Sequence, residues 1–237
     1  MYTGKHKITY YDLDLAGRVK LSALLRMVHI AADINANDLK IGFKELSAIN
    51  MTFVLQRIAF GAARIPAYGE TVEIRTWPSS VARGTFIRKG DMYDESGKKI
   101  MEWASLWILF NISERKILKP SALPLALPEC EDHGVKIMPE KIILPTKENP
   151  FGAEFSAHTH TVRYADVDTN QHMNNSIYGD LIGNAIGSQN WREVQINYLA
   201  ETRQCEEISI TAYHSTDTFL ITGAASNRTS FAARVVV

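Results

Sequence analysis

The sequence predicts an α+β fold built twice over, in which each half is a long helix followed by an antiparallel sheet. Two observations predict it. The same order of patterns (an acidic segment, a helix and several strands) occurs once in each half of the chain, and a proline-rich stretch lies between the halves. A matching order of elements on either side of a linker is typical of an internal repeat.

The composition is that of a globular protein. The chain has 237 residues, of which 46% are apolar and 22% are charged. Its 26 basic and 26 acidic side chains balance, which argues against a dedicated nucleic-acid binder. No apolar stretch of about 18 residues exists, so we expect no membrane span, and residues 1–10 lack the apolar core of a signal peptide. We therefore expect a soluble, cytoplasmic protein, whose two cysteines form no disulfide framework.

The prolines divide the chain. Six of the eight fall between residues 120 and 150. Because proline fixes its own φ and biases the preceding residue away from helix, this stretch predicts an extended, irregular crossover. We expect an N-terminal domain over 1–119, a crossover over 120–154 and a C-terminal domain over 155–237.

The N-terminal half contains one helix pattern and several strand patterns. Apolar residues recur every three or four positions from Leu21 to Ala32, which predicts a helix with one buried face. Residues 71–77 alternate apolar and polar side chains, as a half-buried strand does. Residues 85–93 and 99–110 flank a turn-rich connection and predict a hairpin. The second of these strands is apolar on both faces, so we expect it to be central.

The C-terminal half repeats this order. Apolar residues from Tyr178 to Ile186 predict the second helix, and Asn174 or Asn175 is expected to cap it. The strands that follow are predicted at residues 193–198, 207–213, 218–224 and 231–237.

Candidate catalytic side chains precede this second helix. Asp168, Asn170 and His172 stand at alternate positions, and in an extended backbone residues two apart point the same way. A helix N-terminus behind them favours a developing oxyanion and keeps a nearby histidine neutral. The alternative is structural, since Asp and Asn before a helix are most often caps and turn residues. The three residue types together favour catalysis.

A metal site is not expected. His158 and His160 lie two residues apart on one face of a predicted strand. Zinc needs three or four convergent ligands, and the sequence offers no third.

Residues 168–175 read Asp-x-Asn-x-His-x-Asn-Asn, and Tyr178 follows them. This motif closely resembles the active-site motif of the acyl–acyl carrier protein thioesterases of fatty acid synthesis. Residues 196–202 are similar to that family's second active-site strand, in which a tyrosine precedes a glutamate, here Glu201, by three residues. Residues 53–57, 69–79 and 104–108 are similar to the family's acyl-pocket strands. The resemblance implies a tandem (double) hot-dog fold, in which each half wraps a sheet around one long helix.

The resemblance also implies a reaction: hydrolysis of the thioester between a fatty acyl group and the phosphopantetheine of acyl carrier protein. A thioester is already activated, so no cofactor is expected. Glu201 would be the general base, and His172 would share or relay the proton. Asp168 would orient His172, and Asn170 would position the water or the carbonyl.

The N-terminal half has lost these residues. Aligning its Asp14 with Asp168 places Ala16 opposite Asn170 and Arg18 opposite His172. It is then free to hold the acyl chain rather than to cut it. The candidates for the wall of the acyl tunnel, each of which is otherwise plain core, are Leu25, Phe53, Trp103 and Trp107.

The sequence departs from the family at one position. Plant members carry a cysteine after the glutamate, once proposed as the nucleophile, and here that position is Thr202. Cys205 lies three residues on, and an odd shift turns a strand side chain to the opposite face, so we interpret Cys205 as structural. Glu206 and Glu207 compete with Glu201 for the role of base, and we assign them to a turn and its exposed neighbours.

Two other functions stay open. One is a thioesterase that acts on acyl-coenzyme A with the same residues, because the basic residues that an acidic carrier protein would need are dispersed along the sequence. The other is a non-catalytic hot-dog module that binds acyl groups, such as a lipid-sensing regulator, although such a module has no reason to keep the catalytic set. A homodimer is compatible with the sequence.

Overall fold

The computed structural model describes residues 1–128, 130 and 133–237. The chain forms two compact units. Unit 1 consists of Met1–Ile8 and Met27–Pro139, and unit 2 consists of Thr9–Arg26 and Glu140–Val237. These bounds differ from the predicted domains in two ways. Residues 9–26 pack with the C-terminal half, and the crossover over 120–154 is shared between the units at residue 139.

Unit 1 contains an antiparallel sheet with the order β1-β3-β4-β5-β2, and β6 pairs with β5. The hairpin predicted over 85–93 and 99–110 is confirmed, and its second strand, β5, is central. Most side chains of residues 100–106 are buried on both faces of β5, so both faces of the sheet are covered there. The strands are β1 (Tyr2–Lys7), β2 (Met51–Ala62), β3 (Thr71–Ala82), β4 (Thr85–Tyr93), β5 (Lys99–Asn111) and β6 (Lys116–Leu118).

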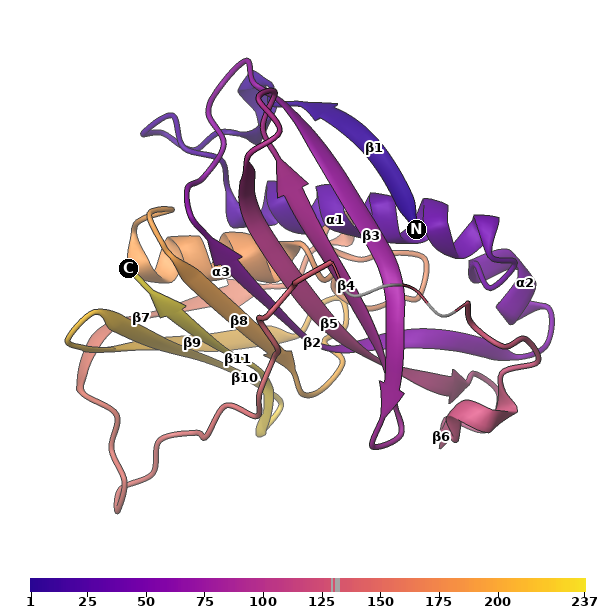
Figure 1. Cartoon of the computed structure of the whole chain (residues 1–237). Helices are drawn as coiled ribbons and strands as arrows, with labels where there is room; N and C mark the ends of the chain where they lie inside the picture. The colour runs from indigo at the N-terminus through magenta and orange to yellow at the C-terminus, as the bar shows by residue number, and fades with distance from the viewer. Residues whose placement is uncertain (129, 131–132) are drawn as a thin grey trace. The chain divides into compact units, whose positions relative to one another are not determined.

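The predicted first helix is confirmed as α1 (Leu21–Asp38), followed by the short α2 (Phe43–Ser47). Residues 27–38 of α1 belong to unit 1 and contact its sheet (Figure 1). The ring of His29 meets the ring of Trp107 edge-on at 6.2 Å, and Asn35 accepts a hydrogen bond from Arg88. The core of the unit is aromatic, since Phe60, Trp77 and Trp103 are fully buried.

Unit 2 contains a second antiparallel sheet with the order β8-β11-β10-β9-β7. All four strands predicted in the C-terminal half are confirmed. The predicted second helix is confirmed as α3 (Ile177–Ile186), which is shorter than α1 and ends at Gly187, whose φ of 67° closes the last turn. The strands are β7 (Ala153–Thr161), β8 (Glu193–Tyr198), β9 (Glu207–Ser215), β10 (Thr218–Ala225) and β11 (Arg228–Val236).

The first turn of α1, residues 21–26, packs against α3 within unit 2. Leu21 N donates to Gln189 Oε1 at 2.9 Å, and Ser22 Oγ donates to Asp180 Oδ1 at 2.5 Å. The backbones approach so closely that a Cβ at Gly179 would lie 2.6 Å from Ser22 N. Glycine at this position therefore sets the distance between the helices. Among the described residues, no helix is long and apolar enough to cross a bilayer.

Candidate active site

The loop that carries the motif is a tight hairpin. It follows the 3₁₀ turn Tyr164–Asp166, and Val167 bridges Met173 in an antiparallel pair. Asp168 N donates to His172 O at 3.0 Å, and Gln171 N donates to Asp168 O at 2.9 Å. Gln171 has a φ of 64°, in the left-handed region. Our prediction of an extended backbone from Asp168 to His172 is therefore wrong, because a turn reverses the chain there.

Asp168 stabilises this turn. Its Oδ1 accepts a hydrogen bond from Asn170 N at 2.8 Å, an arrangement that Asp forms readily in turns. The contact of Asp168 with His172 runs through the backbone, and the imidazole of His172 pairs with Glu201. Asn170 is exposed in the same loop, two positions before His172.

His172 and Glu201, far apart in sequence, meet in unit 2. His172 Nε2 lies 2.9 Å from Glu201 Oε2, and Arg203 Nη2 lies 3.8 Å from the same oxygen. The side chain of His172 is 24% exposed and that of Glu201 is 39% exposed, so both are open to water and to a substrate. An imidazole and a carboxylate at this distance can pass a proton between them.

Glu201 lies beyond the end of its strand, in an irregular segment that the backbone holds. β8 ends at Tyr198, three residues before Glu201. The strand that the resemblance implied over 196–202 therefore does not extend to Glu201. Thr202 O accepts a hydrogen bond from Met173 N at 2.7 Å, which ties the segment to the motif loop. Arg228 Nη2 donates to Glu201 O at 2.7 Å from β11. These bonds fix the backbone on both sides of the carboxylate.

Two tyrosines form the floor beneath this segment. Tyr178 Oη lies 3.3 Å from the hydroxyl of the fully buried Thr202, and Tyr198 Oη donates to Asn175 O at 3.2 Å. The two rings meet edge-on at 5.2 Å. Burial raises the pKa of both phenols, so both remain protonated hydrogen-bond donors at neutral pH.

The competing carboxylates have other roles. Glu206 accepts hydrogen bonds from Arg203 N, Ser226 Oγ and Arg228. Burial acts to raise the pKa of Glu206, but these hydrogen bonds outweigh it and the pKa is lowered. Glu207 begins β9 and is exposed. A carboxylate that closes a turn with three donors is a poor proton acceptor, which favours Glu201 as the base.

Cys205 does not lie on a strand, which was the premise for interpreting it as structural rather than as a nucleophile. Its side chain is exposed, and its φ of 69° places it in a turn rather than on a strand. Its N–H donates to Val162 O at 2.9 Å. The cap of α3 also differs from the prediction of Asn174 or Asn175, because the N-cap residue is Ser176. Asn174 Oδ1 accepts a hydrogen bond from Ser176 N at 2.9 Å, just before the helix begins.

The loop of the N-terminal half repeats the motif loop bond for bond. Leu13 bridges Val19, and Asp14 N donates to Arg18 O at 2.8 Å. Gly17 has a φ of 75°, matching Gln171 of the motif loop. The alignment of Arg18 with His172 therefore holds in three dimensions as well as in sequence.

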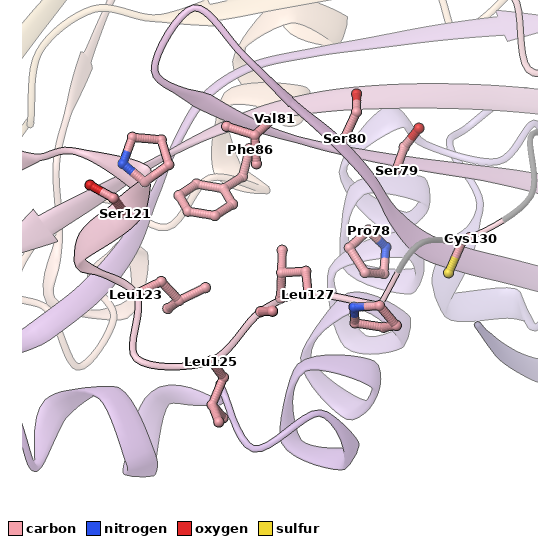
Figure 2. A pocket seen from close by; sticks show the side chains of 13 residues that line it. Pro78, Ser79, Ser80, Val81, Phe86, Ser121, Leu123, Leu125, Leu127 and Cys130 are labelled. Atoms are coloured by element: carbon pink, nitrogen blue, oxygen red, sulfur yellow. The ribbon is translucent and has the colours of Figure 1, made fainter.

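Unit 1 holds a cavity of about 680 Å³ between the β3–β4 hairpin and residues 120–128 and 130 (Figure 2). The four predicted wall residues are not among its lining. Phe53 and Trp107 pack in the hydrophobic cluster to which the lining residues Phe86 and Leu127 belong, and Phe53 meets Phe86 edge-on at 5.1 Å. Trp103 and Leu25 are fully buried core. This cavity was not predicted from the sequence, and the signal that could have indicated it is the alternation of Leu123, Leu125 and Leu127 in the crossover.

His160 has a structural partner in unit 2. Its Nε2 lies 2.9 Å from Asp166 Oδ2, and the same oxygen accepts a hydrogen bond from Arg163 N. Within the described residues, no group of three or more His, Cys, Asp or Glu side chains could hold a metal ion.

Comparisons with known proteins agree with this geometry. The model of the acyl-ACP thioesterase N-terminal domain matches residues 1–121, and that of the acyl-ACP thioesterase C-terminal domain matches residues 152–231. The chain is 30% identical over 142 residues to a chloroplastic dodecanoyl-[acyl-carrier-protein] hydrolase of Cinnamomum camphora, covering 58% of this chain and 37% of that protein. It is 27% identical over 198 residues to oleoyl-acyl carrier protein thioesterase 1, chloroplastic, of Arabidopsis thaliana, covering 77% and 52%. The chain thus spans between about a third and about half of the length of these relatives.

Solved structures confirm the predicted double hot-dog fold. An acyl-ACP thioesterase from Bacteroides thetaiotaomicron superposes with a TM-score of 0.85 at 24% identity, covering 99% of this chain and 96% of that chain. The 12:0-ACP thioesterase from Umbellularia californica superposes with a TM-score of 0.81 at 17% identity, covering 99% and 96%.

Proposed function

The chain belongs to the acyl-ACP thioesterase family, and from this premise we propose that it hydrolyses fatty acyl-[acyl carrier protein] to free fatty acid and carrier protein. The observation that carries the proposal is the His172–Glu201 pair, in which Nε2 and Oε2 lie 2.9 Å apart and both side chains are partly exposed. Backbone hydrogen bonds hold the loop that carries His172. The names of the relatives, hydrolase and thioesterase, support the same reaction.

The mechanism is an attack of water on the thioester carbonyl. Glu201, coupled to His172, takes a proton from the water as its oxygen bonds to the carbonyl carbon. The exposed amide of Asn170 is available to hold the carbonyl oxygen as it gains negative charge. When the C–S bond breaks, His172 returns a proton to the leaving thiolate. No cofactor enters these steps.

Basic side chains border the site and favour an acidic carrier protein as the partner. Arg203 is 60% exposed beside Glu201, and Arg228 is 40% exposed beside Glu206. Arg163 is exposed next to Val162, which pairs with Cys205 and Glu206. Three basic residues that are dispersed in the sequence therefore lie in this part of unit 2, two of them paired with Glu201 and Glu206. Complementary charge speeds the encounter with a carrier protein.

The test is a steady-state assay of fatty acid release by Glu201→Gln. This change keeps the shape of the side chain and removes its basicity, so we expect kcat to fall at least ~10²-fold while KM changes little. Glu207→Gln, an exposed glutamate in the same region, is the matched control and should retain wild-type kcat. Near-normal kcat in Glu201→Gln would transfer the base role to His172.

The same assay separates the two carriers. Acyl groups of equal length are offered on acyl carrier protein and on coenzyme A, and we expect the higher kcat/KM on the carrier protein. A higher kcat/KM on coenzyme A would make the chain an acyl-CoA thioesterase. Absence of fatty acid release from either carrier would contradict both.

A further inference from the structure

The cavity of unit 1 has the size and lining of a ligand site. Its volume of about 680 Å³ lies within the range of known small-molecule pockets. Figure 2 shows Phe86 of β4 and Leu123, Leu125 and Leu127 of the crossover around the same space. Pro78 and Cys130 also line it. Ser79, Ser80 and Ser121 add hydroxyls to a lining that is otherwise largely apolar, which suits a hydrocarbon chain with a polar group on it.

A buried cation stands next to this apolar lining. Arg88 follows Phe86 by two residues on β4, so the two side chains share a face of the strand. In the sheet, Arg88 pairs in register with Pro78 of β3, which also lines the cavity. Arg88 is 9% exposed. Burial lowers the pKa of its guanidinium to about 10, and the nearby thiol of Cys130 acts to raise it, so Arg88 stays charged at neutral pH.

The partners of Arg88 are few and neutral. Its Nη1 donates to Asn35 Oδ1 at 2.9 Å and to Thr76 Oγ1 at 3.3 Å. Within the described residues, these are its side-chain hydrogen bonds, and neither acceptor carries a charge. A guanidinium has five N–H donors in a planar fork, and buried charges are normally paired with an anion or fully hydrogen-bonded. The Nε and Nη2 donors therefore suit an acceptor that a ligand brings.

We propose that this cavity binds acyl chains that carry a hydrogen-bond-accepting oxygen on the hydrocarbon (a carboxylate, a hydroxyl or an oxo group), and that Arg88 receives this oxygen. The inference rests on the proposed function, because it takes the cavity as the place of the acyl chain. It adds a chemical class of substrate, since an apolar tunnel alone would reject an oxygen that must leave water. A carboxylate should bind best, because a bidentate pair with arginine is the strongest of these contacts.

The test measures binding, without turnover, by titration calorimetry. The probes are α,ω-dicarboxylic acids of increasing length, each compared with the monocarboxylic acid of the same length. At the length that reaches Arg88, we expect the diacid to bind about tenfold more tightly, the usual worth of one charge-assisted hydrogen bond. Arg88→Met should remove this preference. Arg75→Met is the matched control, because that arginine pairs with Glu73 and lies over the ring of Tyr93 outside the cavity.

A second variant covers the case in which Arg88→Met does not fold. Asn35→Asp places a carboxylate 2.9 Å from Nη1 with almost no change of shape, so the protein then supplies the anion itself. We expect this variant to fold and to lose the preference for diacids.

Two results would overturn the inference: equal binding of diacids and monoacids at every length, or a preference that survives in both Arg88→Met and Asn35→Asp. These outcomes are independent of catalysis. A chain that prefers diacids but releases no fatty acid from its carrier would refute the proposed function and leave this site standing.

Discussion

At the scale of single residues, Thr202 links the parts of the candidate site. Its carbonyl binds the motif loop, its hydroxyl lies against Tyr178, and its neighbour is Glu201. The residue is fully buried, so a cysteine at the same position would not be open to a substrate. This geometry gives a physical reason to assign the attack to water rather than to a side chain.

We predict that Cys205 is dispensable and that its backbone is strained. A non-glycine residue at a φ of 69° is disfavoured by about 1 kcal/mol, and Gly69, which makes the same turn hydrogen bond to Ile8 in unit 1, has a φ of 84°. Cys205→Gly should therefore be about 0.5–1 kcal/mol more stable than Cys205→Ala in urea unfolding. Both variants should keep wild-type kcat, and a loss of activity in both would restore a role for the thiol.

We predict that His29 makes stability depend on pH. Its Nε2 is buried without a hydrogen bond in the described structure, and burial lowers the pKa of the imidazole to about 4. The unfolded chain, with a histidine pKa near 6.5, binds the proton more readily. The contribution is therefore fully present above about pH 6.5 and is lost as the pH falls toward 4.

His29→Phe keeps an aromatic ring against Trp107 and removes the titration. Relative to wild type, the variant should gain about 2–3 kcal/mol in its free energy of unfolding between pH 7 and pH 4.5, at about 1.4 kcal/mol per unit of pKa shift. Urea unfolding at the two pH values measures this difference. An equal loss of stability in both proteins would place the titrating group elsewhere.

At the scale of elements, the duplicated loops show why one half of the chain carries the chemistry. The loops share their bridge, their turn hydrogen bond and their left-handed residue, but one presents Arg18 where the other presents His172. Counting back four residues from the matched turn residues Gly69 and Cys205 places Ile65 opposite Glu201. The first copy therefore lacks the carboxylate as well as the imidazole.

It follows that histidine alone cannot transfer the activity. His172→Ala should lower kcat at least ~10²-fold, and adding Arg18→His to this variant should leave kcat at the same low level. Steady-state assays of the single and double variants, with circular dichroism to check the fold, measure this. Recovery of activity in the double variant would mean that a residue other than the one at position 65 accepts the proton beside the first loop.

The elements themselves were largely predictable from the sequence. Strands such as β4 and β8 match their predicted bounds residue for residue, although their burial is nearly continuous rather than alternating. The spacing of the motif placed His172 beside a helix start, but it did not reveal that a turn orients it. That turn depends on Gln171 in a conformation that glutamine rarely adopts, so no propensity indicates it.

At the scale of the whole molecule, local sequence patterns could not predict that residues 9–26 belong to unit 2. Leu21, Leu24 and Leu25 predict one buried helix face, but a periodic pattern does not say which partner covers it. The answer lies in α3, whose Gly179 admits the backbone of α1. The cavity at the crossover escaped for a similar reason: Leu123, Leu125 and Leu127 alternate regularly, but the pattern does not say which elements they face.

The placement of residues 9–26 in unit 2 predicts that the C-terminal half does not fold by itself. A fragment of residues 140–237 lacks the partners of Gln189 and Asp180, so we expect no cooperative unfolding transition. A peptide of residues 9–26 added in trans should restore the transition, and a peptide of scrambled sequence should not. Circular dichroism during urea unfolding measures both. Cooperative unfolding of the bare fragment would contradict the assignment of Thr9–Arg26 to unit 2.

The packing of residues 21–26 against α3 also has a consequence for biosynthesis. The hydrogen bond from Leu21 to Gln189 joins residues 168 positions apart. At a translation rate of roughly 5–20 residues per second, a ribosome adds Gln189 roughly 10–30 s after Leu21. Throughout this interval, the apolar face of Leu21, Leu24 and Leu25 stands uncovered on the nascent chain, although all three are buried in the finished protein. The yield of folded protein in an expressing cell should therefore depend on chaperones that shield this segment during synthesis.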